Sequence, residues 1–183
     1  MHKLIAIVGM AGSGKSVATD YLEKNNWNKI YFGGLVYEKM KEENIEITPE
    51  SQKEYRENIR KKYGMAAVAI LLKDKIKESL KEKDTVLDGL YSWDEYVYLK
   101  NIFKDIKLIG IVCDKKLRYK RISIRKERPF NREEINIRDL SEIENLAKGG
   151  PISFADYYIF NNGTINEYIE RLNNILKEIE EER

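Results

Sequence analysis

The sequence predicts a doubly wound α/β protein, in which helices cover both faces of a parallel sheet. Short apolar runs recur along the 183 residues, and longer segments with helical periodicity separate them. The first run ends in a loop that holds three glycines, a lysine and a serine, and a helical segment follows it. Strands that alternate with helices need right-handed crossovers, and such crossovers build a doubly wound sheet.

Five apolar runs are the expected strands. The first, third and fourth are nearly continuous in Ile, Val and Leu, which is typical of parallel strands that are buried on both faces. In chain order the runs are KLIAIVG (3–9), KIYFGG (29–34), TVLDG (85–89), KLIGIVCD (107–114) and DYYIFNNG (156–163).

The segments between the runs are the expected helices, and we expect residues 1–183 to form one domain. Thr48 and Pro49 mark one helix start, because threonine is a favoured N-cap and proline fits the first helical position. The predicted helices span residues 15–25, 35–43, 50–62, 64–83, 92–104, 115–127, 132–147 and 164–182.

Composition excludes several classes of function. The 33 basic and 31 acidic residues give a net charge of +2, so nucleic acid is an unlikely partner for the chain as a whole. The lone histidine, His2, argues against a histidine-centred triad or a zinc site. The single cysteine, Cys113, is expected to be a small buried apolar residue in a reducing compartment. The apolar stretch before Gly9 is too short for a signal peptide or membrane span, so we expect a cytoplasmic protein.

The glycine loop GMAGSGKS, residues 9–16, fits G-x-x-x-x-G-K-[ST] without a mismatch. Glycines let successive backbone N–H groups surround a phosphate, and the helix that follows adds its positive end. Lys15 would reach the β- and γ-phosphates, and the Ser16 hydroxyl would ligate Mg²⁺. The residues expected to hold the nucleotide here are Gly9, Gly12, Ser13, Gly14, Lys15, Ser16 and Val17.

Asp88 ends the third apolar run. Ligands of open α/β sheets sit at the carboxyl ends of the strands, so Asp88 should lie on the same side as the glycine loop. We interpret it as a carboxylate that holds Mg²⁺ through water or orients an acceptor hydroxyl. The alternative is an ordinary Asp-Gly turn.

Arginine is concentrated in one segment, where a helical row could face the nucleotide. Arginine suits phosphate oxygens and stabilises a phosphoryl group in transfer. Arg121 and Arg125 are the favoured phosphate contacts, whereas Arg128 and Arg132 fit a solvated face equally well. In that alternative the arginines pair with Glu127, Glu133, Glu134 and Asp139. The arginines of this segment are Arg118, Arg121, Arg125, Arg128, Arg132 and Arg138.

These features together resemble a known family. The glycine loop, the Asp-Gly turn, the arginine segment and the closing ADYYIFNNGTINEYIERL are similar to P-loop nucleoside-monophosphate kinases and dephospho-CoA kinases. RENIRKKYGMAAVA, residues 56–69, is similar to a stretch in a largely archaeal group of adenylate-kinase-related and dephospho-CoA-kinase-like proteins. The resemblance extends over essentially the whole chain.

The resemblance implies a five-stranded parallel sheet, an acceptor-binding helical region at residues 35–83 and an arginine-rich lid at residues 118–140. It places Arg121 near the adenine and Arg125 near the phosphates. It makes Arg138 the lid arginine that reaches the transferring group. The loop NNGT, which contains Asn162, would border the adenine.

The chain departs from the family at the acceptor site. Gly34, Tyr37 and Tyr91 stand where relatives commonly have an aspartate and two arginines. An acceptor phosphate would then be met by Arg56, Arg60 or tyrosine hydroxyls, including those of Tyr37 and Tyr91. The acceptor is therefore either an unusual nucleotide or a molecule without a phosphate at this position. The aromatic cluster Tyr91, Trp93, Tyr96 and Tyr98 would either stack on a base or pack in the core.

The leading hypothesis is an ATP- and Mg²⁺-dependent phosphotransferase that acts on a small molecule, most simply a nucleotide or nucleotide-like molecule. Its expected catalytic residues are Lys15, Asp88, Arg125 and Arg138. One alternative is an ATP-binding switch with weak hydrolysis and a protein partner. Another is a kinase of RNA or DNA ends, for which the balanced charge supplies no obvious groove.

Overall fold

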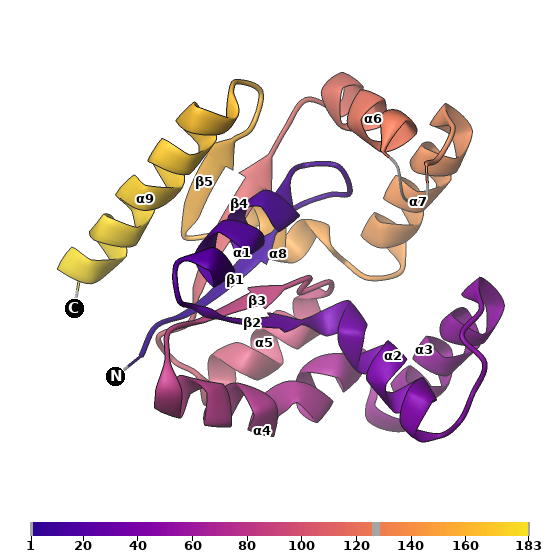
Figure 1. Ribbon diagram of the computed structural model, residues 1–183. Helices are drawn as coiled ribbons and strands as arrows, with labels where there is room; N and C mark the ends of the chain where they lie inside the picture. Colours follow the sequence, from indigo (N-terminus) through magenta and orange to yellow (C-terminus); the bar gives the residue numbers. More distant parts are fainter. Residues whose placement is uncertain (1, 126–128, 183) are drawn as a thin grey trace.

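The computed structural model describes residues 2–125 and 129–182, and these form a parallel sheet with helices on both faces (Figure 1). The sheet has five strands in the order β2-β3-β1-β4-β5, which confirms the predicted fold class. The strands are β1 (Leu4–Val8), β2 (Asn28–Tyr31), β3 (Thr85–Asp88), β4 (Lys107–Val112) and β5 (Tyr157–Phe160).

The helices form two layers and two outlying pairs. Helices α1 and α9 cover one face of the sheet, whereas α2, α4, α5 and α8 contribute to the core on the other face. The bounds are α1 (Lys15–Lys24), α2 (Phe32–Glu42), α3 (Pro49–Tyr63), α4 (Ala67–Glu82), α5 (Trp93–Ile102), α6 (Lys115–Ile124), α7 (Arg132–Glu144), α8 (Gly149–Ser153) and α9 (Ile165–Glu181).

The continuous apolar strands follow from this layering. Successive side chains of a strand point to opposite faces, so a strand between two helical layers must be apolar at every position. In β1, Ile5 and Ile7 pack against α1 and α9, and Leu4, Ala6 and Val8 pack on the opposite face. All five are buried.

The order of the strands fixes where a ligand can bind. The chain crosses from β1 to one side of the sheet to make β2 and β3, and then to the other side to make β4 and β5. Such a switch point opens a crevice at the carboxyl ends of the strands. The glycine loop follows β1 there, and Ile7 of β1 is paired with Asp88 of β3.

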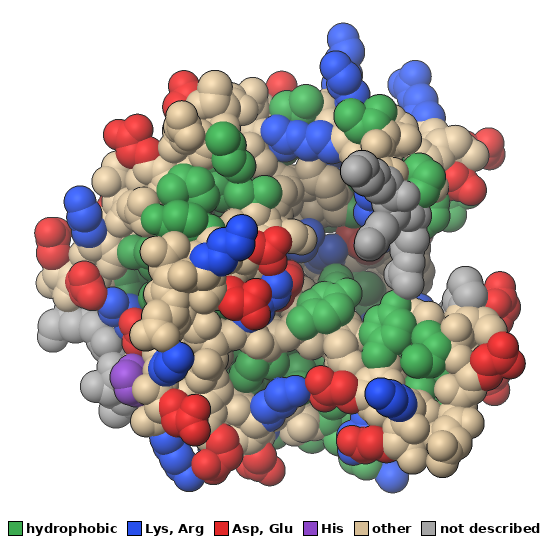
Figure 2. All heavy atoms as spheres, viewed as in Figure 1, with side chains coloured by type: hydrophobic (Ala, Val, Ile, Leu, Met, Phe, Trp, Pro, Cys, Tyr) green, Lys and Arg blue, Asp and Glu red, His purple; other side chains and the backbone are tan. Residues whose placement is uncertain are grey.

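Two helical pairs extend beyond this end of the sheet. Helices α6 and α7 contact each other on one side, and α2 and α3 contact each other on the other side. Figure 2 shows the surface hollowed between these two parts. A small apolar cluster around Ala11, Ile122 and Ile135 joins the glycine loop to α6 and α7.

Local sequence explains several of the helix starts. The predicted cap at Thr48 is confirmed, since its side chain accepts a hydrogen bond from the Ser51 N–H in a capping box. The predicted start of the second helix was wrong: α2 already begins at Phe32, and Gly33 and Gly34 lie in its first turn instead of at the end of the second apolar run. The short helix α8 was not predicted, because five residues carry too little periodicity.

In the part of the chain that the structure describes, no helix combines the length and the apolar character that a membrane crossing requires.

Candidate functional site

The glycine loop has the backbone conformation of an anion cradle. Gly9, Gly12 and Gly14 have φ values of 153°, 76° and 104°, which side chains rarely tolerate. At Gly9 the approach is also too close for any side chain, because a Cβ would lie 2.5 Å from the Ile111 carbonyl oxygen. The loop then leads directly into α1, whose positive end faces the same space.

Lys15 folds over its own loop. Its Nζ donates to the carbonyl oxygens of Gly9 at 2.9 Å and Met10 at 3.2 Å. Burial lowers the pKa of Lys15 to about 7, and the positive charge of Lys148 adds to the effect. So low a pKa means that too little negative charge surrounds the Lys15 ammonium group, and a triphosphate would supply that charge.

Two serine hydroxyls of the loop suit a nucleotide and its metal. Ser16 is exposed at the start of α1, so its hydroxyl is open to an ion. The Ser13 hydroxyl is buried and has no hydrogen-bond partner among the described residues. Buried polar atoms normally have partners, so this atom fits a phosphate contact.

Asp88 lies beside the loop on the neighbouring strand. Its Oδ2 accepts a hydrogen bond from Thr19 Oγ1 of α1 at 3.1 Å and lies 4.0 Å from Lys29 Nζ. Burial raises the pKa of Asp88, and the Thr19 hydrogen bond opposes that shift. The carboxylate is therefore fixed next to α1 at Thr19, three residues after Ser16.

A magnesium ion fits these groups. Within residues 2–125 and 129–182, no three His, Cys, Asp or Glu side chains gather into a metal-binding group. An ion held through Ser16 and Asp88 would thus take its other oxygens from phosphates and water, as Mg²⁺ usually does.

The back of the loop is tied to β5 and α9. Asn161 Nδ2 donates to the Ser13 carbonyl at 2.7 Å, and Tyr168 Oη donates to the Gly14 carbonyl at 3.1 Å. The sequence had pointed to Asn162, which is exposed and whose Oδ1 accepts the Asp114 N–H at 2.9 Å. Asn161, its neighbour in the same motif, is the residue that contacts the loop.

Arg121 lies close to this tie. Its guanidinium donates to Asn161 Oδ1 at 3.4 Å and to Cys113 Sγ at 3.2 Å. The prediction that Cys113 is a buried apolar residue was wrong, because its partly exposed sulfur accepts this hydrogen bond.

Arg118 is a structural residue rather than part of a row that faces the nucleotide. Its guanidinium donates to the Ala11 carbonyl at 2.8 Å and pairs with both oxygens of Asp139, at 3.1 and 2.6 Å. Both side chains of the pair are 8% exposed. This buried pair links the glycine loop, α6 and α7.

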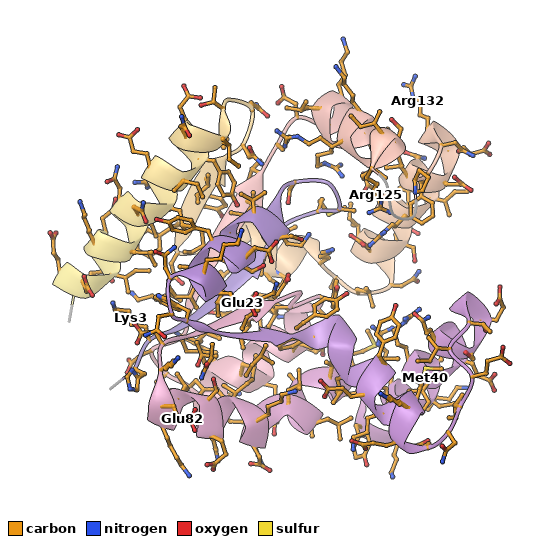
Figure 3. All side chains as sticks on the ribbon, in the orientation of Figure 1. Lys3, Glu23, Met40, Glu82, Arg125 and Arg132 are labelled. Carbon is orange, nitrogen blue, oxygen red and sulfur yellow. The ribbon has the colours of Figure 1, made fainter. Side chains whose placement is uncertain are left out.

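Arg125 and Arg138 gather around one aromatic ring. Their guanidinium carbons lie 5.1 Å and 5.8 Å from the centre of the Phe130 ring. In Figure 3, Arg125 lies on the inner side of α6 and α7, whereas the exposed Arg132 points outward from the start of α7. The prediction for Arg128 lies outside the described residues.

A buried lysine completes the positive charge of the site, and sequence reasoning missed it. Lys148, between α7 and α8, is 2% exposed, and its Nζ donates to Glu142 at 2.6 Å. Glu142 also accepts from Arg138 Nε at 3.0 Å. Lys148 Nζ lies 5.1 Å from the centre of the Tyr91 ring. Lysine is usually a surface residue, so nothing in the sequence marked this one.

The four predicted acceptor residues lie on α2, on α3 and in the segment after β3. Tyr37 is on α2, and Arg56 and Arg60 are on α3; all three are half-buried. Tyr91 lies after β3, where burial raises its pKa, as do the nearby Tyr31 phenol and Asp88.

Glu95 holds the segment after Tyr91 in place. It is 1% exposed, and its Oε2 accepts the N–H groups of Tyr91 at 2.7 Å and Ser92 at 3.1 Å in a capping box. Burial raises the pKa of Glu95 to about 7, although these hydrogen bonds and the positive charge of Arg60 lower it.

Comparisons with known proteins agree with this geometry. A family described as "AAA domain" matches residues 5–145. A UPF0200 protein of Methanocaldococcus jannaschii is 32% identical over 96% of this chain and 90% of its own length. A UPF0200 protein of Sulfurisphaera tokodaii is 34% identical over 97% of both chains.

Solved structures share the fold. The protein TT1252 of Thermus thermophilus has a TM-score of 0.66 and 18% identity over 97% of this chain and 98% of its own. Shikimate kinase of Bacteroides thetaiotaomicron has a TM-score of 0.59 and 14% identity over 96% of this chain and 98% of its own. At these identities the likeness concerns the fold.

The Arg118–Asp139 pair yields a stability prediction. Arg118→Ala leaves a buried carboxylate without its partner, so we expect the free energy of unfolding to fall by about 3–5 kcal/mol. The double variant Arg118→Met/Asp139→Leu, which removes both charges, should lose far less. Urea unfolding measures both, with Arg171→Ala, which breaks an exposed pair with Glu178, as the control. Equal losses in the single and double variants would contradict the ion-pair account.

Glu95 yields a prediction for pH. Because its folded pKa of about 7 lies above its ordinary value of 4.5, the folded state binds the extra proton between these pH values. As the pH rises from 5 to 8, the free energy of unfolding of the wild type should thus fall by about 3 kcal/mol relative to that of Glu95→Gln. Urea unfolding across this range measures the difference.

Glu167 is the matched control, since it closes the same capping box at α9 but is exposed. Its hydrogen bonds with Thr164 lower its pKa, so its contribution is lost only as the pH falls through that low value. Glu167→Gln should leave the profile between pH 5 and pH 8 unchanged. A Glu95→Gln profile that also matches the wild-type profile would refute the buried-carboxyl account.

Proposed function

The chain belongs to the AAA-domain family and to the UPF0200 proteins, and we propose that it is an ATP- and Mg²⁺-dependent phosphotransferase with a small-molecule acceptor. The observation that carries the proposal is the edge of the sheet where the glycine loop and Asp88 stand side by side on paired strands. One side of that edge suits a triphosphate, and the other opens into the hollow of Figure 2. The acceptor class we favour is a nucleotide or nucleotide-like molecule.

The loop would hold the triphosphate of ATP. Lys15 exchanges the carbonyls of Gly9 and Met10 for phosphate oxygens, and the Ser13 hydroxyl gains a partner. Ser16 and Asp88 would hold Mg²⁺, which would supply positive charge to the phosphates. The contacts of Asn161 and Tyr168 keep the loop in shape while Lys15 changes partners.

The arginines would neutralise the group in transfer. Phosphoryl transfer needs little covalent work from a protein, and positioning and charge supply most of the acceleration. Arg125 and Arg138 are carried by α6 and α7, next to Lys148, whose charge already acts on Lys15. Arg121, which touches Asn161, would border the adenine together with the loop of Asn162.

The acceptor would lie between this group and α2 and α3, where Tyr37, Arg56, Arg60 and Tyr91 stand. Structures that share the fold include proteins named as a shikimate kinase and, from Janibacter, a sugar kinase. These names agree with a kinase but leave the acceptor to the chemistry of this site.

One observation favours a nucleotide-dependent switch instead. The positions of Tyr37 and Tyr91 carry no acceptor-phosphate arginines, which a protein that transfers nothing would not need. A switch, however, gives no role to Arg125 and Arg138 beside the loop. Acceptor-stimulated turnover decides between the two functions.

Lys15→Ala should lower ATP affinity or turnover by about 100-fold or more, because it removes the cation that meets the phosphates. ADP formation from Mg·ATP measures this, with a panel of ribo- and deoxynucleoside monophosphates, dephospho-CoA and nucleosides. Lys24→Ala, an exposed lysine at the other end of α1, is the control. Unaltered affinity and turnover in Lys15→Ala would remove the phosphate-loop assignment. ATP binding that no acceptor converts into turnover would favour the switch.

Arg125→Ala should lower turnover by about 100-fold with little change in unfolding temperature, since the residue lies at the end of α6 beside the proposed phosphates. Arg132→Ala removes an outward-pointing arginine from the same segment and should leave turnover unchanged. Single-turnover kinetics and thermal unfolding separate the two effects. A large loss of stability with normal turnover in Arg125→Ala would make it a structural residue.

A further inference from the structure

Two tyrosine phenols meet beside Asp88 on the acceptor side of the site. Tyr31 ends β2 and is the paired neighbour of Asp88 at the end of β3. Tyr91 lies three residues after Asp88. The Tyr31 phenol and the Asp88 carboxylate both help to raise the pKa of the Tyr91 phenol. The glycine loop follows β1 on the other side of β3, so these phenols lie across Asp88 from the nucleotide.

Glycines hold both phenols close to the strand ends. A Cβ on Gly33 would lie 2.4 Å from Tyr31 Oη, and a Cβ on Gly89 would lie 2.9 Å from Tyr91 Oη. Carbon atoms do not approach oxygen so closely, so each tyrosine occupies space that only a glycine leaves. Gly89 also has a φ of +94°, which favours glycine. The half-buried Tyr91 ring therefore forms the floor of the acceptor side, and the Tyr31 ring, which is 48% exposed, forms its edge.

Three of the cations around this floor already face carboxylates. Glu142 accepts hydrogen bonds from both Arg138 and Lys148. The negative charge of buried Glu95 stabilises the charged form of Arg60. A phosphate monoester would bring almost two further negative charges among them. Neutral phenols can each donate one hydrogen bond but cannot offset such a charge, and a poorly matched buried anion is costly.

We propose that the acceptor presents hydroxyl groups and no phosphate to Tyr31 and Tyr91, as an unphosphorylated nucleoside or sugar does. The inference rests on the phosphoryl-transfer function proposed above and specifies its substrate class. In the step itself, the acceptor hydroxyl oxygen forms a bond to the γ-phosphorus of ATP and the bond from that phosphorus to the β,γ-bridging oxygen breaks. ADP leaves and the hydroxyl proton passes to solvent.

The test compares matched acceptors. ADP formation from Mg·ATP is measured with five nucleosides (adenosine, guanosine, cytidine, uridine and inosine) and with ribose and glucose, each beside its monophosphate. We expect at least one unphosphorylated compound to stimulate turnover at least about tenfold more than its monophosphate. Preference for the monophosphates, or no response to any unphosphorylated compound, overturns the inference.

The same assay tests the proposed function separately from this inference. Stimulation that depends on Lys15 but comes only from phosphorylated acceptors would leave the kinase proposal standing and remove this one. If no compound stimulates ADP formation that depends on Lys15, both are removed.

Variants locate the effect. Tyr31→Phe and Tyr91→Phe should each raise the KM for the unphosphorylated acceptor about tenfold, the loss of one hydrogen bond, with the KM for ATP unchanged. Tyr157→Phe is the control, because Tyr157 lies at the start of β5 and its hydroxyl donates a hydrogen bond to Glu182. Gly33→Ala, which displaces the Tyr31 ring, should repeat the effect of Tyr31→Phe. Unaltered acceptor KM values in all three site variants would show that the phenols do not contact the acceptor.

Discussion

The geometry of the site depends on how the carbonyl groups of the glycine loop are satisfied. A loop that turns its N–H groups toward an anion must turn carbonyls elsewhere, and buried carbonyls need donors. Here the donors are side chains from distant parts of the chain: Arg118 for Ala11, Asn161 for Ser13 and Tyr168 for Gly14. The loop is therefore shaped by α6, β5 and α9, and not by its own glycines alone.

The same contacts make the arginine segment part of the loop's support. Arg118 donates to the loop through Nη1 and to Asp139 of α7 through both Nη1 and Nη2. Two helices that stand away from the sheet are thus anchored directly at the glycine loop. A movement of α7 that brought Arg138 toward a nucleotide would turn about this anchor. Because the ion pair is buried, it resists separation more strongly than an exposed pair would.

The sequence predicted the parts of the site that depend on local pattern. The loop, the strand before it and the cap at Thr48 follow from residue type and spacing, so they could be located without a structure. The distinction between Asn161 and Asn162 could not, since one residue in a turn decides which amide reaches Ser13. Arginine spacing likewise put Arg118 on the same helical face as its neighbours. The alternative interpretation included Asp139 among the paired carboxylates but placed the pairs on a solvated face, whereas this pair is buried.

Lys148 and Glu142 show the same limit at the level of charge. Each belongs to a type that is usually exposed, but both are buried here, where the segment after α7 leads into α8, which contacts β4 and α5. Lys15, Arg138 and Lys148 then share the nearby carboxylates Glu142 and Asp88, which leaves an excess of positive charge. Burial makes this excess of positive charge unfavourable in the protein alone, and the pKa of Lys15 is lowered for this reason. The negative charge of a triphosphate would relieve it, so the stability given up to assemble these cations becomes affinity for the nucleotide.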